Sequence, residues 1–484
     1  MKPLLHNMLT PPPPPPRPLS IHALARKRPR PARRLALGLL AASILGGCTV
    51  TEPLVRPDIA LPAAWSEPSA SAASSIADTW WQGFGSPQLD ALVAEAMLSA
   101  PDLRIQAERV VQAELALRQA GASLLPSLAL GGGSGVHNAE GDESASTSAS
   151  LNARYEIDLW GRLAATRDAS RASLASTRFD HEAARLSMAA NVATLWFQGL
   201  TLAERVDIAR QNLAIAERVL RVVQARYDHG AASALDLSQQ RSTVLAQRKA
   251  IEPLEVSLRQ TRSALAILLG HPPQTGFAAG ARLTELHVPV IDAGLPSELL
   301  LRRPDIAASE AALAAAAANL AAARAALLPA ISLTAGAATS SAELLALAGR
   351  NSVLSLSAAL LQTIFDGGRL AADVDIQRSR QRELVEAHRQ AVLTALKEVE
   401  DALANTARDA RQESAQHEIL AEARRSLRLS ELRYREGADG LLAVLDAQRA
   451  LFAAQDQLVQ LRLARLSGAV DLYRALGGGW QAGG

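Results

Sequence analysis

Aromatic residues and cysteine are scarce in this chain. Phe, Trp and Tyr make up 3% of the 484 residues, and Cys48 is the single cysteine. One cysteine excludes an intramolecular disulfide, and so few aromatic side chains are unusual for the core of a compact enzyme. Ala, Leu, Arg, Glu and Gln abound instead, a composition typical of long helices and coiled coils.

Motifs that carry chemistry are missing as well. The sequence has no Gly-x-Ser-x-Gly elbow, no phosphate loop ending in Gly-Lys-Ser or Gly-Lys-Thr, and no His-Glu-x-x-His. The nine histidines show no paired ligand spacing, and no lysine follows GGGSG at residues 131–135. We therefore expect no enzyme activity, no cofactor and no metal site, and we interpret GGGSG as a flexible or bulged strand.

Long apolar runs are also lacking in the helical part of the chain. The Ala-rich stretch 304–333 resembles a membrane span, but Glu310, Asn319 and Arg324 interrupt it. Its longest uninterrupted apolar run, residues 311–318, is far shorter than the roughly 20 residues that a bilayer requires. We expect a packed helix here.

The N-terminus has the pattern of an exported lipoprotein. Residues 1–34 carry eight Lys or Arg and no acid, and LALGLLAASILGGC follows at 35–48. This predicts a signal peptide over 1–47 and acylation of Cys48, which would become the mature N-terminus and anchor the chain in lipid. Removing the eight positive charges from a formal net charge of +2 leaves −6. We therefore expect no nucleic-acid partner.

The mature chain is a tandem repeat. Arg162, Tyr227, Gly230 and Gly270 recur 207 residues later as Arg369, Tyr434, Gly437 and Gly477. One extra residue after the second Gly turn aligns Gln240 with Gln448. We place an anchor and N-terminal extended segment at 48–100, repeat one at 101–295, repeat two at 296–477 and a C-terminal tail at 478–484.

Each repeat contains one very long helical stretch and a shorter returning one. Apolar residues at alternating steps of three and four predict a coiled-coil seam, as at Val206, Ala209, Leu213, Ala216, Leu220, Val223 and Tyr227. Residues 162–227 and 369–434 would each span on the order of 100 Å. Pro253 should kink or break the returning helix of repeat one.

Each repeat also contains a β-hairpin. In residues 149–159, Leu151, Ala153 and Tyr155 alternate with polar residues, so one face of the strand is apolar and the other is wet. Weaker alternation near 128–130, 331–333 and 354–360 predicts three more strands. We expect the hairpin tips at 137–144 and 340–351.

An exported chain with such strands suggests a transmembrane β-barrel. Four strands cannot close one, because two unpaired edges would remain in lipid. Two copies would give eight strands and three copies twelve, and the strand pattern does not choose between them. A small surface sheet on a periplasmic coiled-coil rod is the alternative.

The sequence resembles the TolC-type outer-membrane efflux family, in its lipoprotein branch that serves resistance-nodulation-division pumps. The matching stretches are WWQGFGSPQLDALV (80–93), YEIDLWGR (155–162), PSELLLRRPDI (296–306), FDGGR (365–369), RYREGADGLLAVLDAQRALF (433–452) and the LLP motifs starting at Leu124 and Leu327. The resemblance implies an α+β membrane protein with a repeated order of strand, strand, long helix and helix. Three chains would share a twelve-stranded barrel in the outer membrane, continued by a periplasmic α-helical barrel.

The resemblance also implies where the functional residues lie. Gly230 and Gly437, with Tyr227 and Tyr434, would form the periplasmic tip that docks an adaptor protein. Leu442 and Asp446 match the constriction rings of the lipoprotein branch, and Asp236 is the related acid of repeat one. From the residues alone, Asp446 is better explained as an exposed carboxylate that favours the start of a helix, and the match to the motif is what favours the gate. A salt-bridge latch from Asp236 is doubtful because repeat two has Asp439 near the expected basic position.

The function implied is a passive exit duct for drugs or other small toxic compounds, driven by an inner-membrane pump through the adaptor. An exit channel for type I protein secretion and a lipid-anchored, non-channel scaffold are the alternatives.

Overall fold

The computed structural model describes residues 57–67, 76–139, 142–276, 282–346 and 351–481. All of them belong to one unit, Val50–Gly484. The signal peptide predicted over 1–47 and the acylation site Cys48 lie outside the described residues.

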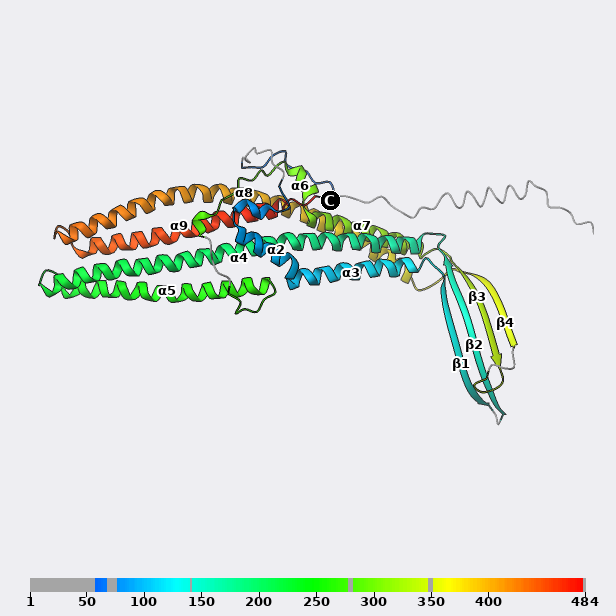
Figure 1. Cartoon of the computed structure of the whole chain (residues 1–484). Helices are drawn as coiled ribbons and strands as arrows, with labels where there is room; N and C mark the ends of the chain where they lie inside the picture. The colour runs from blue at the N-terminus through cyan, green and yellow to red at the C-terminus, as the bar shows by residue number, and fades with distance from the viewer. Residues whose placement is uncertain (1–56, 68–75, 140–141, 277–281, 347–350, 482–484) are drawn as a thin grey trace, which may run out of the picture. The chain divides into compact units, whose positions relative to one another are not determined.

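The described residues form two passes of one motif, as the repeat predicted (Figure 1). The first pass contains the 3-10 helix η1 (Trp80–Phe84), α2 (Pro87–Ser99), α3 (Pro101–Ala122), β1 (Ser127–Ala139), β2 (Asp142–Ile157), α4 (Arg162–Asp228) and α5 (Ala234–Leu268). The second contains η2 (Leu283–Glu285), η3 (Pro296–Glu298), α6 (Leu299–Arg302), α7 (Pro304–Ala325), β3 (Ala330–Ser341), β4 (Asn351–Leu361), α8 (Arg369–Arg435) and α9 (Leu441–Ala475). The strand, strand, long helix, helix order is confirmed.

The two long helices begin in the same way, at the junction with the sheet. The Asp158 carboxylate accepts hydrogen bonds from the backbone N–H groups of Leu163 and Ala164 at 3.1 and 2.7 Å. In repeat two the Asp366 carboxylate accepts from the N–H groups of Gly368 and Leu370, both at 3.0 Å. Each aspartate satisfies backbone donors that a helix N-terminus leaves unpaired, so α4 and α8 start at equivalent points.

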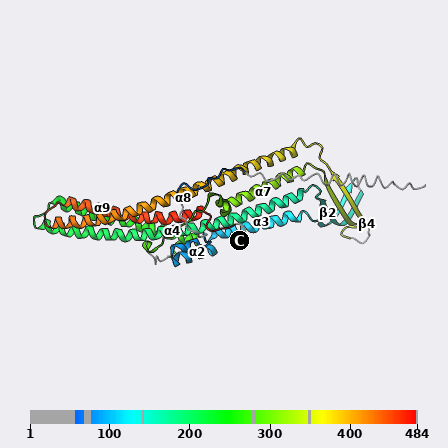
Figure 2. The ribbon, with the colours of Figure 1, turned by 90° about the horizontal axis from the view of Figure 1, so that it is seen from above.

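The helices pack through the predicted seams. Helix α5 lies along α4 and α9 lies along α8 (Figure 1), and α9 also contacts α4 (Figure 2). Val206, Ala209, Ala216 and Val223 of the α4 seam are buried. The main core cluster includes a few aromatic rings among aliphatic side chains, and the ring of the buried Trp80 stacks on Tyr473 near the end of α9 with a centroid separation of 5.1 Å.

Of the kink or break expected at Pro253, the break does not occur, because α5 runs continuously from Ala234 to Leu268. The missing N–H of a proline leaves the carbonyl four residues earlier without its helical donor. That residue is Lys249, and both Lys249 and Pro253 are exposed, so water can hydrate this carbonyl. Packing along α4 then keeps α5 in one piece.

The four strands form one antiparallel sheet in the order β1-β2-β3-β4, so β1 and β4 are its edges. The register places Leu130 opposite Leu151, and Leu151 opposite Ala337, which pairs with Leu354. These residues share one face, and their neighbours in sequence share the other. The predicted alternation is confirmed on all four strands.

Two details of the strands differ from expectation. The first hairpin tip is tighter than 137–144, since strand pairing continues to His137–Ser144 and Ala139–Asp142. The hydrogen bonds of the ladder join backbone groups, so the polar side chains of this stretch do not interrupt them. The run 131–135 pairs one-to-one without a bulge. A Cβ on Gly131 would lie 3.1 Å from Ser150 Oγ, so glycine leaves room for the opposing hydroxyl.

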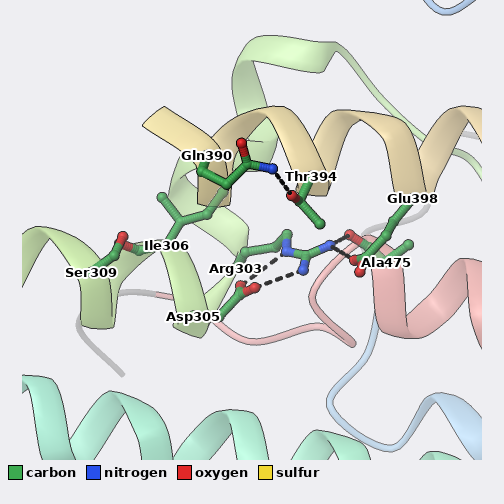
Figure 3. A network of polar contacts seen from close by, with 8 residues as sticks. All are labelled: Arg303, Asp305, Ile306, Ser309, Gln390, Thr394, Glu398 and Ala475. Atoms are coloured by element: carbon green, nitrogen blue, oxygen red, sulfur yellow. Dashed lines mark hydrogen bonds and ion pairs between the residues drawn. The ribbon is translucent and has the colours of Figure 1, made fainter. Parts of the chain in front are cut away.

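Helix α7 is the one helix among the described residues with the length and composition of a membrane span. It packs between α4 and α8, as expected from its interrupted apolar pattern. At its start the buried Arg303 donates to both carboxylate oxygens of Asp305, at 2.9 and 2.7 Å (Figure 3). Arg303 also donates to Glu398 of α8 at 2.7 Å and to the Ala475 carbonyl of α9 at 3.0 Å. The guanidinium thus ties three helices together.

Candidate gate at the helix-hairpin tips

The two helical hairpins end in matching turns, at the end of the molecule away from the sheet (Figure 1). Gly230 and Gly437 follow α4 and α8 with φ angles of 74° and 75°, a left-handed conformation in which glycine meets no Cβ clash. The next N–H closes each turn, from Ala231 to the Arg226 carbonyl and from Ala438 to the Arg433 carbonyl. The glycines therefore end the rods and reverse the chain.

The first turn leads into α5 through a capping box. Ser233 Oγ accepts from the Asp236 N–H at 3.1 Å, and the Asp236 carboxylate accepts from the N–H and the hydroxyl of Ser233 at 2.9 and 2.8 Å. Two orphan donors of the helix start are satisfied in this way. Asp236 thus holds the start of its own helix in the described structure.

The second turn is held differently. Helix α9 starts at Leu441 after Gly440, which offers no side-chain cap. Arg433 instead donates to both carboxylate oxygens of Asp439, at 2.5 and 3.0 Å. The hydrogen bond from Arg433 lowers the pKa of Asp439 below its ordinary value. The turn of repeat two is therefore spanned by a surface ion pair, whereas the turn of repeat one leads into a capping box.

Arg226 of α4 joins the two hairpins. Its Nη1 donates to the backbone carbonyls of Tyr434 and Arg435 at 2.7 and 3.2 Å, and its Nη2 reaches the Ala231 carbonyl at 3.4 Å. The guanidinium carbon lies 4.8 Å from the centroid of the Tyr434 ring. These hydrogen bonds satisfy the last carbonyls of α8, which have no donor within the helix. The positive charge of Arg226 also interacts favourably with the negative end of the helix dipole and with the Tyr434 ring.

The repeat explains why Arg226 is available for this contact. Arg226 is the counterpart of Arg433, but the counterpart of Asp439 is Ala232. Repeat one therefore lacks the acid that would hold its arginine, and Arg226 turns to the other hairpin.

The two repeat-related tyrosines consequently differ. The Tyr434 ring is 5% exposed, whereas the Tyr227 ring is 41% exposed. Burial raises the pKa of the Tyr434 hydroxyl. Of the predicted docking residues, Tyr227 presents its ring on the surface and Tyr434 packs between the hairpins.

The predicted constriction residues lie on the first turns of α9. Leu442 is 61% exposed although it is apolar, and Asp446 is exposed one turn later. Arg449 of the same helix forms an ion pair with the Asp446 carboxylate. Leu442 and Asp446 thus share an uncovered face of this chain, next to the buried cluster that joins the hairpins. This cluster comprises Val219, Val223, Leu237, Leu420, Ala423, Leu427, Tyr434, Leu441, Val444, Leu445, Ala447, Leu451, Phe452 and Ala454.

Sequence reasoning placed Tyr227, Gly230, Tyr434, Gly437, Asp236, Leu442 and Asp446 at the tips, and the structure brings all seven to this end of the hairpins. It missed Arg226 as the link between hairpins and Arg449 as the partner of Asp446. A signal for Arg226 existed, because the repeat alignment shows an arginine whose acid is missing.

Metal binding finds no support in the described part of the chain, where no three His, Cys, Asp or Glu side chains are grouped for it.

The sequence matches the profile of the outer membrane efflux protein family over residues 92–271 and 295–478. The pyoverdine export outer membrane protein OpmQ of Pseudomonas putida is 42% identical over 465 residues, covering 93% of this chain and 98% of that protein. The cation efflux system protein CusC of Escherichia coli is 34% identical over 453 residues, covering 92% and 98%.

Solved structures agree with the sequence relatives. A crystal structure of CusC superimposes with a TM-score of 0.80 at 31% identity, covering 89% of this chain and 100% of that one. The open state of the MtrE outer membrane channel of Neisseria gonorrhoeae gives 0.81 at 28% identity, covering 89% and 98%. Because these proteins are outer-membrane channels, the expectation that the chain is not an enzyme is confirmed. The chain belongs to the outer membrane efflux protein family and is an outer-membrane efflux channel.

Proposed function

We propose that the mature protein is a lipid-anchored trimeric exit duct. In this proposal the signal peptide 1–47 is removed, Cys48 is acylated, and 48–100 carries the anchor and leads to the repeats at 101–295 and 296–477, with a tail at 478–484. An inner-membrane pump drives cargo through a periplasmic adaptor into the duct, which performs no chemical step of its own.

The sheet is the observation that carries the trimer. In a single chain, large apolar side chains on one face of the sheet are exposed to solvent. Leu128, Leu130, Leu354 and Leu356 are 68 to 86% exposed. The outer edges of β1 and β4 have no further strand in the described sheet. In lipid each unpaired backbone group costs several kcal/mol, so copies must pair edge to edge. Three copies give the twelve strands that the family resemblance implies.

The helices support the same arrangement. Helix α3 packs against α4, and Ile105, Val111 and Leu115 remain about half exposed on it. Helix α8 packs against α7 and α9, and Ile376 and Leu393 are similarly bare. These are the first and last helices of the layer α3-α4-α7-α8, so a neighbouring copy would cover both apolar surfaces.

The gate follows from the tip geometry. In a trimer the uncovered side chains of Leu442 and Asp446 would form two rings at the periplasmic end, one apolar and one acidic. An apolar ring can seal a pore by dewetting, and an acidic ring favours cations. Arg226 would hold the hairpins together in the closed state, with the capping acid Asp236 beside it. The turns at Gly230 and Gly437 and the exposed ring of Tyr227 would meet the adaptor, while Tyr434 supports them from between the hairpins.

The cargo proposed is a small compound, either a drug or another toxic molecule. The named relatives act on small solutes: pyoverdine for OpmQ, cations for CusC and, at 32% identity, toluene for TtgC of Pseudomonas putida. This range supports the small-solute class and leaves the individual compound open to experiment.

A direct test measures the assembly and its conductance. The detergent-purified protein should have the mass of three chains by light scattering and should conduct ions in planar lipid bilayers. A monomer without conductance, recovered without detergent, would overturn the duct and favour a scaffold.

A further inference from the structure

The polar face of the sheet is almost free of charge. Across its middle, three rows of paired residues carry only small or neutral side chains. These rows are Ala129–Asn152–Gly336–Ser355, Gly131–Ser150–Ala338–Val353 and Gly133–Ser148–Ser340. Any ionised group on this face therefore dominates its local potential.

Arg154 is such a group. It pairs in register with Ser127 on one side and Thr334 on the other, and Thr334 pairs with Ser357. The only hydrogen bond of Arg154 to a side chain involves its backbone carbonyl, which accepts from Ser127 Oγ at 3.3 Å. Among the described residues its exposed guanidinium has neither an ion-pair nor a hydrogen-bond partner.

The nearest acid on the same strand face is already neutralised. Glu156 lies two residues further along β2, and its carboxylate accepts from Arg162 at 2.8 Å. This pair leaves the Arg154 guanidinium without a neutralising carboxylate on the polar face of β2.

The alternation of β2 decides which way Arg154 faces. Its neighbours in sequence, Ala153 and Tyr155, belong to the apolar face with Leu151 and Leu333. If the apolar face meets lipid, the polar face and Arg154 line the lumen. Near the membrane interface, where the sheet meets the helices, a guanidinium on the lipid side would cost at most about 1 kcal/mol, so the register of β2 and not this cost assigns Arg154 to the polar face.

We propose that Arg154 makes the β-barrel end of the duct selective for anions, by placing three unpaired guanidinium groups around the lumen. This rests on the trimeric duct proposed above. The cargo class favoured is a small solute bearing carboxylate, sulfonate or phosphate groups, because guanidinium binds these oxyanions with two parallel hydrogen bonds. The ring of Asp446 at the opposite end reduces the anion selectivity of the duct only weakly, because each Asp446 carboxylate is paired with Arg449.

The test is the reversal potential of the purified channel in planar bilayers under a KCl gradient. Arg154→Gln should shift the potential toward cation preference, and Arg154→Lys should keep the wild-type preference. Glu156→Gln frees Arg162 and should shift it toward anions. The shifts should be several-fold larger near 0.1 M than near 1 M salt, where the Debye length falls from about 10 Å to about 3 Å.

A second readout uses citrate as a small polyanion, added to the chamber on the β-barrel side. Citrate should cause brief current blocks in the wild type and Arg154→Lys, and at least tenfold fewer in Arg154→Gln. Unchanged reversal potentials and unchanged block in a conducting Arg154→Gln channel would overturn the role of Arg154 alone. A wild-type protein that does not conduct would overturn the duct itself.

Discussion

Arg226 and Tyr434, which come from different repeats, bind the two helical hairpins to each other at their tips. The guanidinium of Arg226 lies 4.8 Å from the centroid of the Tyr434 ring and donates to the Tyr434 carbonyl at 2.7 Å. The contact joins α4 to the end of α8, at a point where the arginine of repeat one lacks the acid that its counterpart in repeat two has.

Arg226→Ala should loosen the closed tip. It removes hydrogen bonds from a charged donor, worth about 1.5–3 kcal/mol, and a cation–π contact worth about 0.5–2 kcal/mol. We expect a higher open probability in single-channel recordings, with the trimer retained. Arg226→Lys should give an intermediate effect, because lysine keeps the charge and loses the planar fork.

Arg221→Ala is the matched control for this change. Arg221 is exposed on the same helix, and its side chain forms no hydrogen bond or ion pair among the described residues. Equal leakage in the two alanine variants would show that loss of positive charge at the tip, and not the Arg226–Tyr434 contact, controls closure.

The double variant Leu442→Ala with Asp446→Ala should give a leakier pore. Smaller side chains widen the constriction, and loss of the carboxylate ring shifts the ion selectivity at this end toward anions. Single-channel conductance and the entry of large antibiotics into intact cells should both rise. Leu235→Ala is the control, since Leu235 is 65% exposed on the first turn of α5. If the double variant behaves like this control, the gate does not lie at these residues.

The Arg433–Asp439 pair should respond to acid only at low pH. Arg433 lowers the pKa of Asp439 below its ordinary value of 3.8. Because the pKa of Asp439 is lower in the folded than in the unfolded chain, the ion pair stabilises the folded turn fully at pH values above the unfolded pKa. This stabilisation is lost as the pH falls through the folded pKa, which lies below 3.8. In recordings of the wild type at decreasing pH, the Arg433–Asp439 pair should therefore cause no change in the open probability until the pH falls below 3.8.

The matching variant for the acid response is Asp439→Asn, which lacks the titrating group. At neutral pH it should already behave like the acidified wild type, with a small effect because the pair is at the surface. A wild-type transition near pH 6 that disappears in Asp439→Asn would contradict the lowered pKa.

If Cys48 is acylated, the measured mass of the mature N-terminal peptide should exceed the mass calculated from its amino-acid sequence. Mass spectrometry of the purified protein should find residues 1–47 absent and the thiol modified by acyl chains. Cys48→Ser should release the anchor and leave barrel formation intact, because the sheet carries its own apolar face. An unmodified Cys48 would remove the lipid anchor from the proposal.

The sequence by itself determined the elements that depend on local pattern. A repeat offset of 207, steps of three and four along α4, and alternation along β2 fixed where rods and strands lie, because each periodicity reflects which side chains share a face. The break allowed for at Pro253 and the bulge allowed for at 131–135 do not occur, for a related reason. The exposure of Lys249, whose carbonyl water can reach, and the space that Gly131 leaves for the Ser150 hydroxyl depend on residues distant in sequence. A local sequence pattern does not contain this information.

Only the tertiary structure decided the contacts at the tips. Tyr227 and Tyr434 occupy the same place in the repeat, and one is exposed while the other is buried beneath Arg226. Identical periodicity cannot distinguish them, since burial depends on how α9 packs between α8 and α4. The sequence thus set the faces of the helices, and the packing of one hairpin against the other chose which residue of each pair lies at the contact.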